Sequence, residues 1–128
     1  MMLLPIRLGI GGRLGSGRQW LSWIHIDDLI GGIAHRWKQA LSDPSAPTFG
    51  ATNFTAPIAV SQLEFSQAAA RVWKRLCVIP TPGWPMRLAL GEQADLLLEG
   101  QRVVPLRFAR EGFEFTYPAL EAALRSLK

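Results

Sequence analysis

The clearest periodic pattern of the chain lies between residues 61 and 76. Ser61 and Glu64 stand three residues apart at its start, which is the spacing of a capping box. The apolar positions that follow recur every three or four residues, as on one buried face of an amphipathic helix: Phe65, Ala68, Ala69, Val72, Trp73 and Leu76. The pattern predicts a helix that begins near Ser61 and packs against the core.

A second helical pattern follows residues 23–26, a short segment with the composition of a strand. Asp27 or Asp28 then offers a side chain that can cap the helix. The apolar positions of this helix recur at helical spacing and predict one buried face: Ile30, Ile33, Ala34, Trp37 and Leu41. Its polar side carries His35, Arg36, Lys38 and Gln39.

The rest of the chain predicts shorter elements. The glycines between residues 9 and 17 interrupt any helix or strand there. We expect strands over residues 49–56 and 113–117, with a loop over residues 42–47. Further helices are expected over residues 2–8, 85–90, 92–99 and 105–112, and after Pro118, where Leu120, Leu124 and Leu127 line one face. The fold class that follows is α/β, in the form of a mixed α+β chain.

The composition is that of one globular domain. Of 128 residues, 48% are hydrophobic and 19% are charged. The net charge of +4 comes from basic residues scattered along the chain, so we expect a solvated surface and no nucleic-acid partner. The one cysteine, Cys77, lies in an apolar stretch, which favours a small buried side chain and a reducing compartment such as the cytoplasm. No apolar run approaches the ~18 residues of a membrane span.

Three patterns of catalytic chemistry are absent from the sequence. A dinucleotide-binding fingerprint that began at Gly9 and Gly11 would need glycine at position 14, where leucine stands. Ser16 lacks the flanking glycines of a nucleophile elbow. The only tyrosine, Tyr117, is followed four residues later by Glu121, so the tyrosine–lysine pair of carbonyl reduction cannot form. We therefore assign no catalytic residue to this chain.

Candidate binding residues lie around the glycine run. Trp20 and Trp23 flank a loop with Arg18 and Gln19, and a guanidinium with aromatic planes on flexible backbone suits a nucleotide or sugar-phosphate pocket. Packing within the core is the alternative interpretation of both tryptophans. His25 and the two aspartates that follow it could hold a metal ion, but a third and fourth ligand are not evident, so no metal site is expected.

Several motifs are specific in combination: GSGRQW at residues 15–20, WIHIDDL at 23–29, LEGQRVVP at 98–105 and GFEFTYP at 112–118. With them the chain resembles, over essentially its whole length, the C-terminal part of atypical extended short-chain dehydrogenase/reductases of the nucleoside-diphosphate-sugar epimerase (NAD-dependent epimerase/dehydratase) family. The resemblance implies a protein of two parts, an N-terminal Rossmann half that binds NAD(P) and a C-terminal half that covers the substrate. This chain would be the second part.

The resemblance also implies a domain organisation and a set of site residues. Residues 1–80 would complete the epimerase-like domain, and residues 81–128 would form the family's helical C-terminal extension. The positions that match the family's cofactor and substrate cleft are Gly15, Gln19, Trp23, His25 and Asp28. Better-characterised members place an arginine where this chain has Leu21, and Arg18 is the candidate to replace it from another point on the loop.

Three hypotheses follow. In the first, the chain is the substrate-side portion of an NAD(P)-dependent epimerase-like oxidoreductase with a nucleotide-sugar-like substrate, and it binds no cofactor and has no activity without the Rossmann half. In the second, it is a non-enzymatic interaction module that docks on another chain, or associates with itself, through apolar surface. In the third, it is an independent enzyme that uses Arg18, His25 and Asp28.

Overall fold

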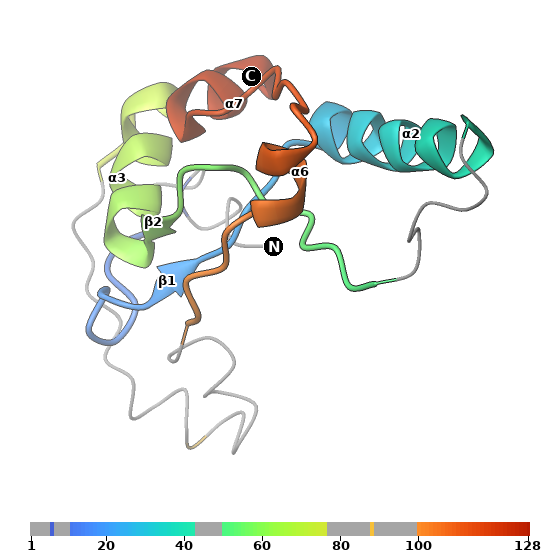
Figure 1. Cartoon of the computed structure of the whole chain (residues 1–128). Coiled ribbons are helices and arrows are strands. Elements are labelled where there is room, and N and C mark those ends of the chain that lie inside the picture. The colour runs from blue at the N-terminus through green and yellow to red at the C-terminus, as the bar shows by residue number, and fades with distance from the viewer. Residues whose placement is uncertain (1–5, 7–10, 43–49, 77–87, 89–99) are drawn as a thin grey trace.

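The computed structural model describes residue 6 and residues 11–42, 50–76, 88 and 100–128. Its elements, in chain order, are β1 (Trp20–Leu21), α2 (Ile26–Ser42), β2 (Val60–Ser61), α3 (Gln62–Trp73), α6 (Leu106–Arg110) and α7 (Leu120–Ser126). Strands β1 and β2 pair antiparallel, with Trp20 opposite Ser61 and Leu21 opposite Val60. Figure 1 shows α3 and α7 side by side, whereas α2 extends away from them. The mixed α and β composition agrees with the sequence prediction.

The core lies between α3 and α7. The side chains buried there come from both helices and from residue 6: Ile6, Ala68, Ala69, Ala70, Val72, Leu120 and Leu124. The predicted capping box of α3 is confirmed, because the Ser61 hydroxyl accepts from the Glu64 N–H while the Glu64 carboxylate accepts from the Ser61 N–H. Small alanines on α3 let α7 approach closely, and this packing positions the segments described below.

Helix α2 begins earlier than the sequence predicts, and the strand predicted at residues 23–26 is wrong. The Leu29 N–H donates to the His25 carbonyl at 2.9 Å, which is the first helical hydrogen bond, so His25 occupies the cap position. Its Nδ1 accepts from the Asp27 N–H at 3.2 Å. An imidazole therefore caps the helix in place of either aspartate, and the strand lies instead at Trp20–Leu21.

The face of α2 that the sequence predicts to be buried is exposed. Its large apolar residues have exposed fractions of 52% or more: Ile26, Ile30, Ile33, Trp37 and Leu41. The residues of α2 buried within the chain are Asp28 and Gly32. A Cβ on Gly32 would lie 2.9 Å from Cζ of Phe108, so the glycine is what allows α6 to approach this side of the helix. The helix thus turns its polar and small residues inward.

Two further predicted strands are absent from the part of the chain that the structure describes. Residues 50–56 and 113–117 form no strand. In the first segment, the backbone bond to Trp23 runs from the Ala56 N–H to the Trp23 carbonyl at 2.7 Å, and no neighbouring strand pairs with these residues. In the second, the N–H groups of Thr116 and Tyr117 donate to the carboxylate of Asp28, which takes the place of a sheet partner.

The C-terminal helices are as predicted. Helix α6 follows Pro105 and is succeeded by Gly112, whose φ of 69° is in the left-handed region. Helix α7 follows Pro118 and buries Leu120 and Leu124, although Leu127 is 52% exposed. The helices predicted over residues 2–8, 85–90 and 92–99 lie outside the described residues except for residues 6 and 88, and Cys77 also lies outside them.

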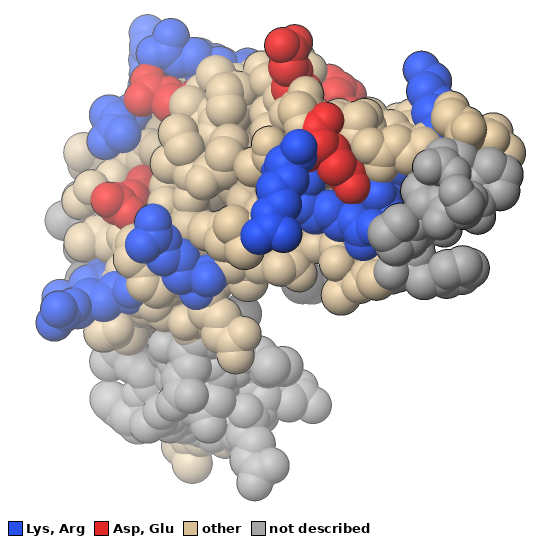
Figure 2. Space-filling view, viewed as in Figure 1, with Lys and Arg blue, Asp and Glu red and all other residues tan. Residues whose placement is uncertain are grey.

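The surface carries charge of both signs. On the face shown in Figure 2, Lys and Arg side chains are spread over several elements, with acidic side chains between them. This distribution fits the scattered basic residues of the sequence. Among the helices described, none is long and apolar enough to cross a membrane.

Candidate functional site

The glycine run forms a tight turn that is held against α3. Gly15 and Gly17 have φ values of 56° and 67°, and the Gly17 N–H donates to the Leu14 carbonyl at 2.9 Å. The side chain of Gln62, which is 3% exposed, accepts from the Leu14 N–H at 2.9 Å and donates to the Gly12 carbonyl at 3.1 Å. This role of Gln62 could not be predicted from the sequence, because its partners lie 48 and 50 residues away.

Arg18 and Gln19, both candidates from the sequence, face different environments. The Arg18 side chain is exposed and makes no hydrogen bond or ion pair with any described residue. Gln19 is 6% exposed, and its Nε2 donates to the Leu14 carbonyl at 3.0 Å, while its own carbonyl accepts from the Gln62 N–H. The amide therefore holds the turn closed, whereas the guanidinium lies at the surface.

The two tryptophans of the motif also differ. Trp23 packs against the core, and its Nε1 donates to the Ile58 carbonyl at 2.9 Å. Trp20 is 38% exposed on β1, and the guanidinium of Arg102 lies 5.2 Å from the centroid of its ring. Trp23 thus serves the packing, while Trp20 and Arg18 present an aromatic plane and a cation at the surface.

His25 is buried, and both nitrogens of its ring are engaged. Nδ1 accepts the Asp27 N–H, so it carries a lone pair. The Ser126 hydroxyl donates to the Ala123 carbonyl at 2.7 Å, so the contact of 2.9 Å between Ser126 Oγ and His25 Nε2 is a bond that the ring donates. The ring is thus held from both sides, with Asp27 Oδ2 also 3.5 Å from Nδ1, and its centroid lies 4.1 Å from that of the Tyr117 ring.

Asp28 is the most deeply buried of the candidate residues, with 2% of its surface exposed. Its two oxygens accept from the backbone of the C-terminal segment, Oδ1 from Thr116 N–H at 2.7 Å and Oδ2 from Tyr117 N–H at 2.9 Å. Each carboxylate oxygen thus has one backbone N–H donor. Asp28 also lies in the first turn of α2, where the helix dipole stabilises a negative charge. Asp28 ties the start of α2 to a segment 88 residues away.

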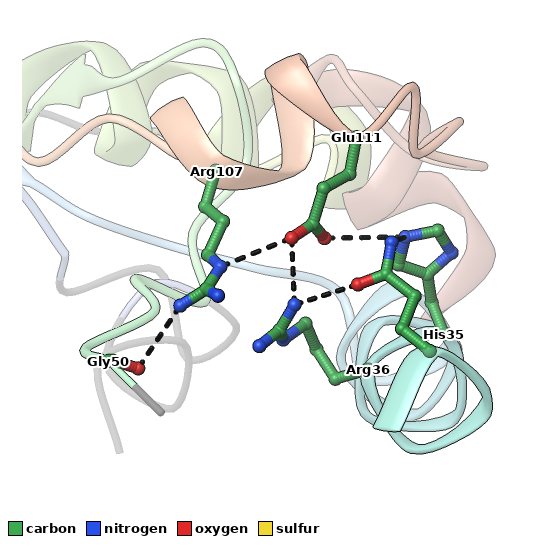
Figure 3. A network of polar contacts seen from close by, with 6 residues as sticks. His35, Arg36, Gly50, Arg107 and Glu111 are labelled. Carbon is green, nitrogen blue, oxygen red and sulfur yellow. Dashed lines mark hydrogen bonds and ion pairs between the residues drawn. The ribbon is translucent and has the colours of Figure 1, made fainter. Parts of the chain in front are cut away.

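A polar network that the sequence did not predict joins α2 to α6 (Figure 3). Arg36 Nη1 and Arg107 Nε both donate to Glu111 Oε1, at 2.7 and 3.1 Å. His35 Nε2 lies 3.4 Å from the other oxygen, Oε2, which makes no hydrogen bond. Gln39 bridges Arg36 and His35 on α2, since its Oε1 accepts from Arg36 Nη1 at 2.7 Å and its Nε2 lies 3.1 Å from His35 Nε2. The sequence signal that could have revealed part of it is the four-residue spacing of Arg107 and Glu111.

An apolar hollow of about 280 Å³ opens at the start of α2. It is lined by residues 23–26, by Phe65 of α3, and by residues of the α7 segment: Leu120, Ala123, Leu124 and Leu127. Two candidates from the sequence, Trp23 and His25, therefore meet in one place. Gly15, Arg18, Gln19 and Asp28 do not line this hollow. No cluster of three or more metal-ligating side chains occurs among the described residues.

Taken together, the candidate residues Gln19, Trp23, His25 and Asp28 are bonded within the chain. Each holds a turn, a strand end or a helix start in place. A role at the border of a cofactor or substrate cleft remains a prediction for all six candidates.

Known proteins with similar sequences are epimerase family proteins. The epimerase family protein SSP1921 of Staphylococcus saprophyticus is 43% identical over 127 residues, and SDR39U1 of Mus musculus is 41% identical over 130 residues. These matches cover 99% and 98% of this chain but 41% of each relative. In addition, the model of a family described as a domain of unknown function, DUF1731, matches residues 81–127.

The fold agrees with a solved structure of such a protein. The crystal structure of human epimerase family protein SDR39U1 (isoform 2) with NADPH matches with a TM-score of 0.81 and 39% identity, over 98% of this chain and 41% of that one. The chain matches the C-terminal part of an epimerase family protein. It spans about two-fifths of the length of these relatives, and its fold is that of a fragment of a Rossmann-type protein.

Proposed function

We propose that this chain is the substrate-side part of an NAD(P)-dependent, epimerase-like oxidoreductase, and that it works only when an NAD(P)-binding part covers the outward face of α2. The observation that carries the proposal is the reversed polarity of this helix. We define the α2 face as the exposed apolar residues of α2: Ile26, Ile30, Ile33, Ala34, Trp37, Ala40 and Leu41. At 3.6 residues per turn, all seven fall within an arc of roughly 120°.

Such a face is unusual on a helix at the surface of a complete domain, where the apolar stripe packs inward and the polar side meets water. Here Asp28, His35, Arg36 and Gln39 lie on the side of α2 that meets the rest of the chain. A contiguous exposed apolar surface of this length marks a contact with another body. The exposed α2 face therefore supports the proposal that another part of the protein covers it.

The relatives indicate what kind of body that is. The epimerase family proteins that match this chain are more than twice its length, and the human one binds NADPH in its crystal structure. In this chain the backbone of the glycine turn is bonded to the side chain of Gln62, and the sequence contains no dinucleotide-binding fingerprint. We therefore assign the cofactor, and the hydride chemistry that it supplies, to the covering part.

This chain would then contribute to the substrate side. Arg18 is exposed without an acidic partner among the described residues, and Trp20 presents part of its ring to solvent. A cation and an aromatic plane suit the phosphate and the base of a nucleotide-sugar-like substrate. The single cysteine of the chain favours a reducing compartment, and we propose the cytoplasm.

A second candidate function rests on the same face. A non-enzymatic interaction module would also expose an apolar helix, and it would dock on another chain without contributing to any reaction. The two proposals differ in whether the assembled protein binds a nicotinamide dinucleotide.

The test compares this chain with a chimera in which it replaces the matching C-terminal part of SSP1921. Binding of NADPH is measured by isothermal titration calorimetry. We expect no binding by the chain alone up to about 1 mM, and binding by the chimera in the micromolar range. Dissociation below about 1 mM from the chain alone would refute the assignment of the cofactor to the covering part. A folded chimera without NADPH binding would favour the interaction module.

A further inference from the structure

The apolar hollow at the start of α2 offers almost nothing to a polar ligand. The polar groups of its lining side chains are already bonded within the protein: His25 at both nitrogens and Trp23 at Nε1. The other lining side chains are aliphatic or phenyl groups. A sugar hydroxyl or phosphate placed here would lose its water without gaining a partner, at a cost of roughly 1–3 kcal/mol for each neutral group.

The size of the hollow points to a side chain as its occupant. Sites for small molecules and cofactors usually enclose roughly 300–1,000 Å³. The hollow measures about 280 Å³ and opens to the surface, so it is too small for a nucleotide sugar but large enough for one aromatic or branched apolar side chain. Binding interfaces concentrate affinity at such places, where an anchor residue fills a preformed pocket.

The hollow is continuous with the α2 face. Ile26 belongs to both, since it lines the hollow and is the first apolar residue of the face. Leu127, which also lines the hollow, is 52% exposed just after α7. From Ile26 to Leu41 the helix rises about 22 Å, at 1.5 Å per residue. A body that covers this length of α2 also reaches the mouth of the hollow.

We propose that the hollow is a socket for one large apolar side chain of the NAD(P)-binding part, and that this contact anchors one end of the interface along α2. The inference rests on the proposed function, because it takes the covering part as its occupant. The socket joins α2, α3 and α7, so filling it fixes the position of the C-terminal helices relative to the covering part. A second copy of this chain, or a free apolar molecule, would be a different occupant.

The experiment measures thermal unfolding of three variants, each in this chain alone and in the chimera with SSP1921. Leu127→Gln alters the rim of the socket, and Ile33→Gln alters the middle of the α2 face. Leu106→Gln is the matched control, because Leu106 is 62% exposed on α6 and lines neither surface. Glutamine retains good helix propensity and adds no charge.

In the chain alone, we expect all three variants to unfold within about 2 °C of the parent, since each position is exposed. In the chimera, Leu127→Gln and Ile33→Gln each lower the unfolding temperature by roughly 5 °C, because a buried apolar contact is replaced by an amide, while Leu106→Gln has little effect. Hydrogen exchange on the unsubstituted proteins should show slower exchange at residues 23–26 and 120–127 in the chimera than in the chain alone.

The outcomes separate the two proposals. If Ile33→Gln destabilises the chimera but Leu127→Gln behaves like the control, the socket is refuted while the covering of α2 stands. If Ile33→Gln also behaves like the control, the covering part does not use α2, and the proposed function fails with the socket. Equal destabilisation of the chain alone by Leu127→Gln would show that the rim supports the chain's own core, which also overturns the socket. Unchanged exchange at residues 23–26 would do the same.

Discussion

Asp28 allows the sharpest test of how α2 is held in the chain. Replacing it with asparagine keeps the size and shape of the side chain but exchanges one accepting oxygen for an NH₂ group. In the structure both oxygens accept from backbone N–H groups, of Thr116 and Tyr117, and the carboxylate is 2% exposed. Asp28→Asn therefore places a donor against a donor where water cannot intervene.

The magnitude follows from these contacts. A hydrogen bond to a charged group contributes about 1.5–3 kcal/mol net, and an unsatisfied buried donor costs about 1–3 kcal/mol. We expect Asp28→Asn to lower the free energy of unfolding by about 2–4 kcal/mol, since one of the two bonds survives. Asp28→Ala should cost more, because it leaves both N–H groups unpaired. Against a total stability of about 5–15 kcal/mol for a domain, either loss is large.

Asp27 provides the matched control. It lies in the same first turn of α2, and its side chain is 62% exposed. Asp27→Asn removes the same charge near the same helix terminus, which should cost less than about 1 kcal/mol. The assay is urea unfolding followed by tryptophan fluorescence and circular dichroism. Equal free energies of unfolding for Asp27→Asn and Asp28→Asn, within about 0.5 kcal/mol, would show that the buried bonds to residues 116 and 117 are not important for stability.

Two further predictions concern α2 and α3. Gly32→Ala should lower the free energy of unfolding by about 1–3 kcal/mol, because the added Cβ would lie 2.9 Å from Phe108. This loss outweighs the better helix propensity of alanine. Urea titration measures the change, and a stabilised variant would contradict the close approach. Hydrogen bonds from the backbone and then the hydroxyl of Ser61 lower the pKa of Glu64, so this bond stabilises the protein above the unfolded-state pKa and the gain is lost as pH falls through the folded-state pKa. Ser61→Ala removes the hydroxyl bond and should raise the pKa of Glu64 toward its ordinary value in an NMR titration, whereas an unchanged pKa would show that the hydroxyl bond does not contribute.

Local signals in the sequence were sufficient for the start of α3 and for α6 and α7, whereas α3 ends at Trp73, and Leu76, predicted to lie on its buried face, is 75% exposed. The capping box of Ser61 and Glu64 involves residues three apart, and both bonds form as expected. Pro105 and Pro118 precede the two C-terminal helices, and Leu120 and Leu124 are buried as their spacing predicts. These features depend on neighbours in the chain, so no knowledge of distant contacts was needed.

The orientation of α2 could not be derived in this way. Its periodicity correctly separates an apolar side from a polar side, but it does not say which side meets the rest of this chain. That choice is made by Asp28 and Glu111, whose partners lie 75 to 89 residues away in sequence. The same contacts explain the wrong strand prediction at residues 113–117, because Thr116 and Tyr117 donate to a carboxylate in place of a neighbouring strand.

Around the candidate residues, the local backbone could be predicted from the sequence, but the bonds of the side chains could not. The glycine turn with left-handed Gly15 and Gly17 matches its composition, and the resemblance to epimerase family proteins agrees with their sequences and with the fold. The internal bonds of Gln19 and His25, in contrast, depend on packing that no motif encodes.

The polar attachment of α2 restricts how this helix can move relative to the rest of the chain. Apolar surfaces can slide over one another at little cost, whereas hydrogen bonds to a carboxylate have fixed directions and lengths. Asp28 holds one end of α2 and Glu111 holds its middle, so the helix cannot rotate about its axis or shift along it without breaking one of these attachments. A body that docks on the outer side of α2 is therefore aligned with the α6–α7 region by two carboxylates that it never touches.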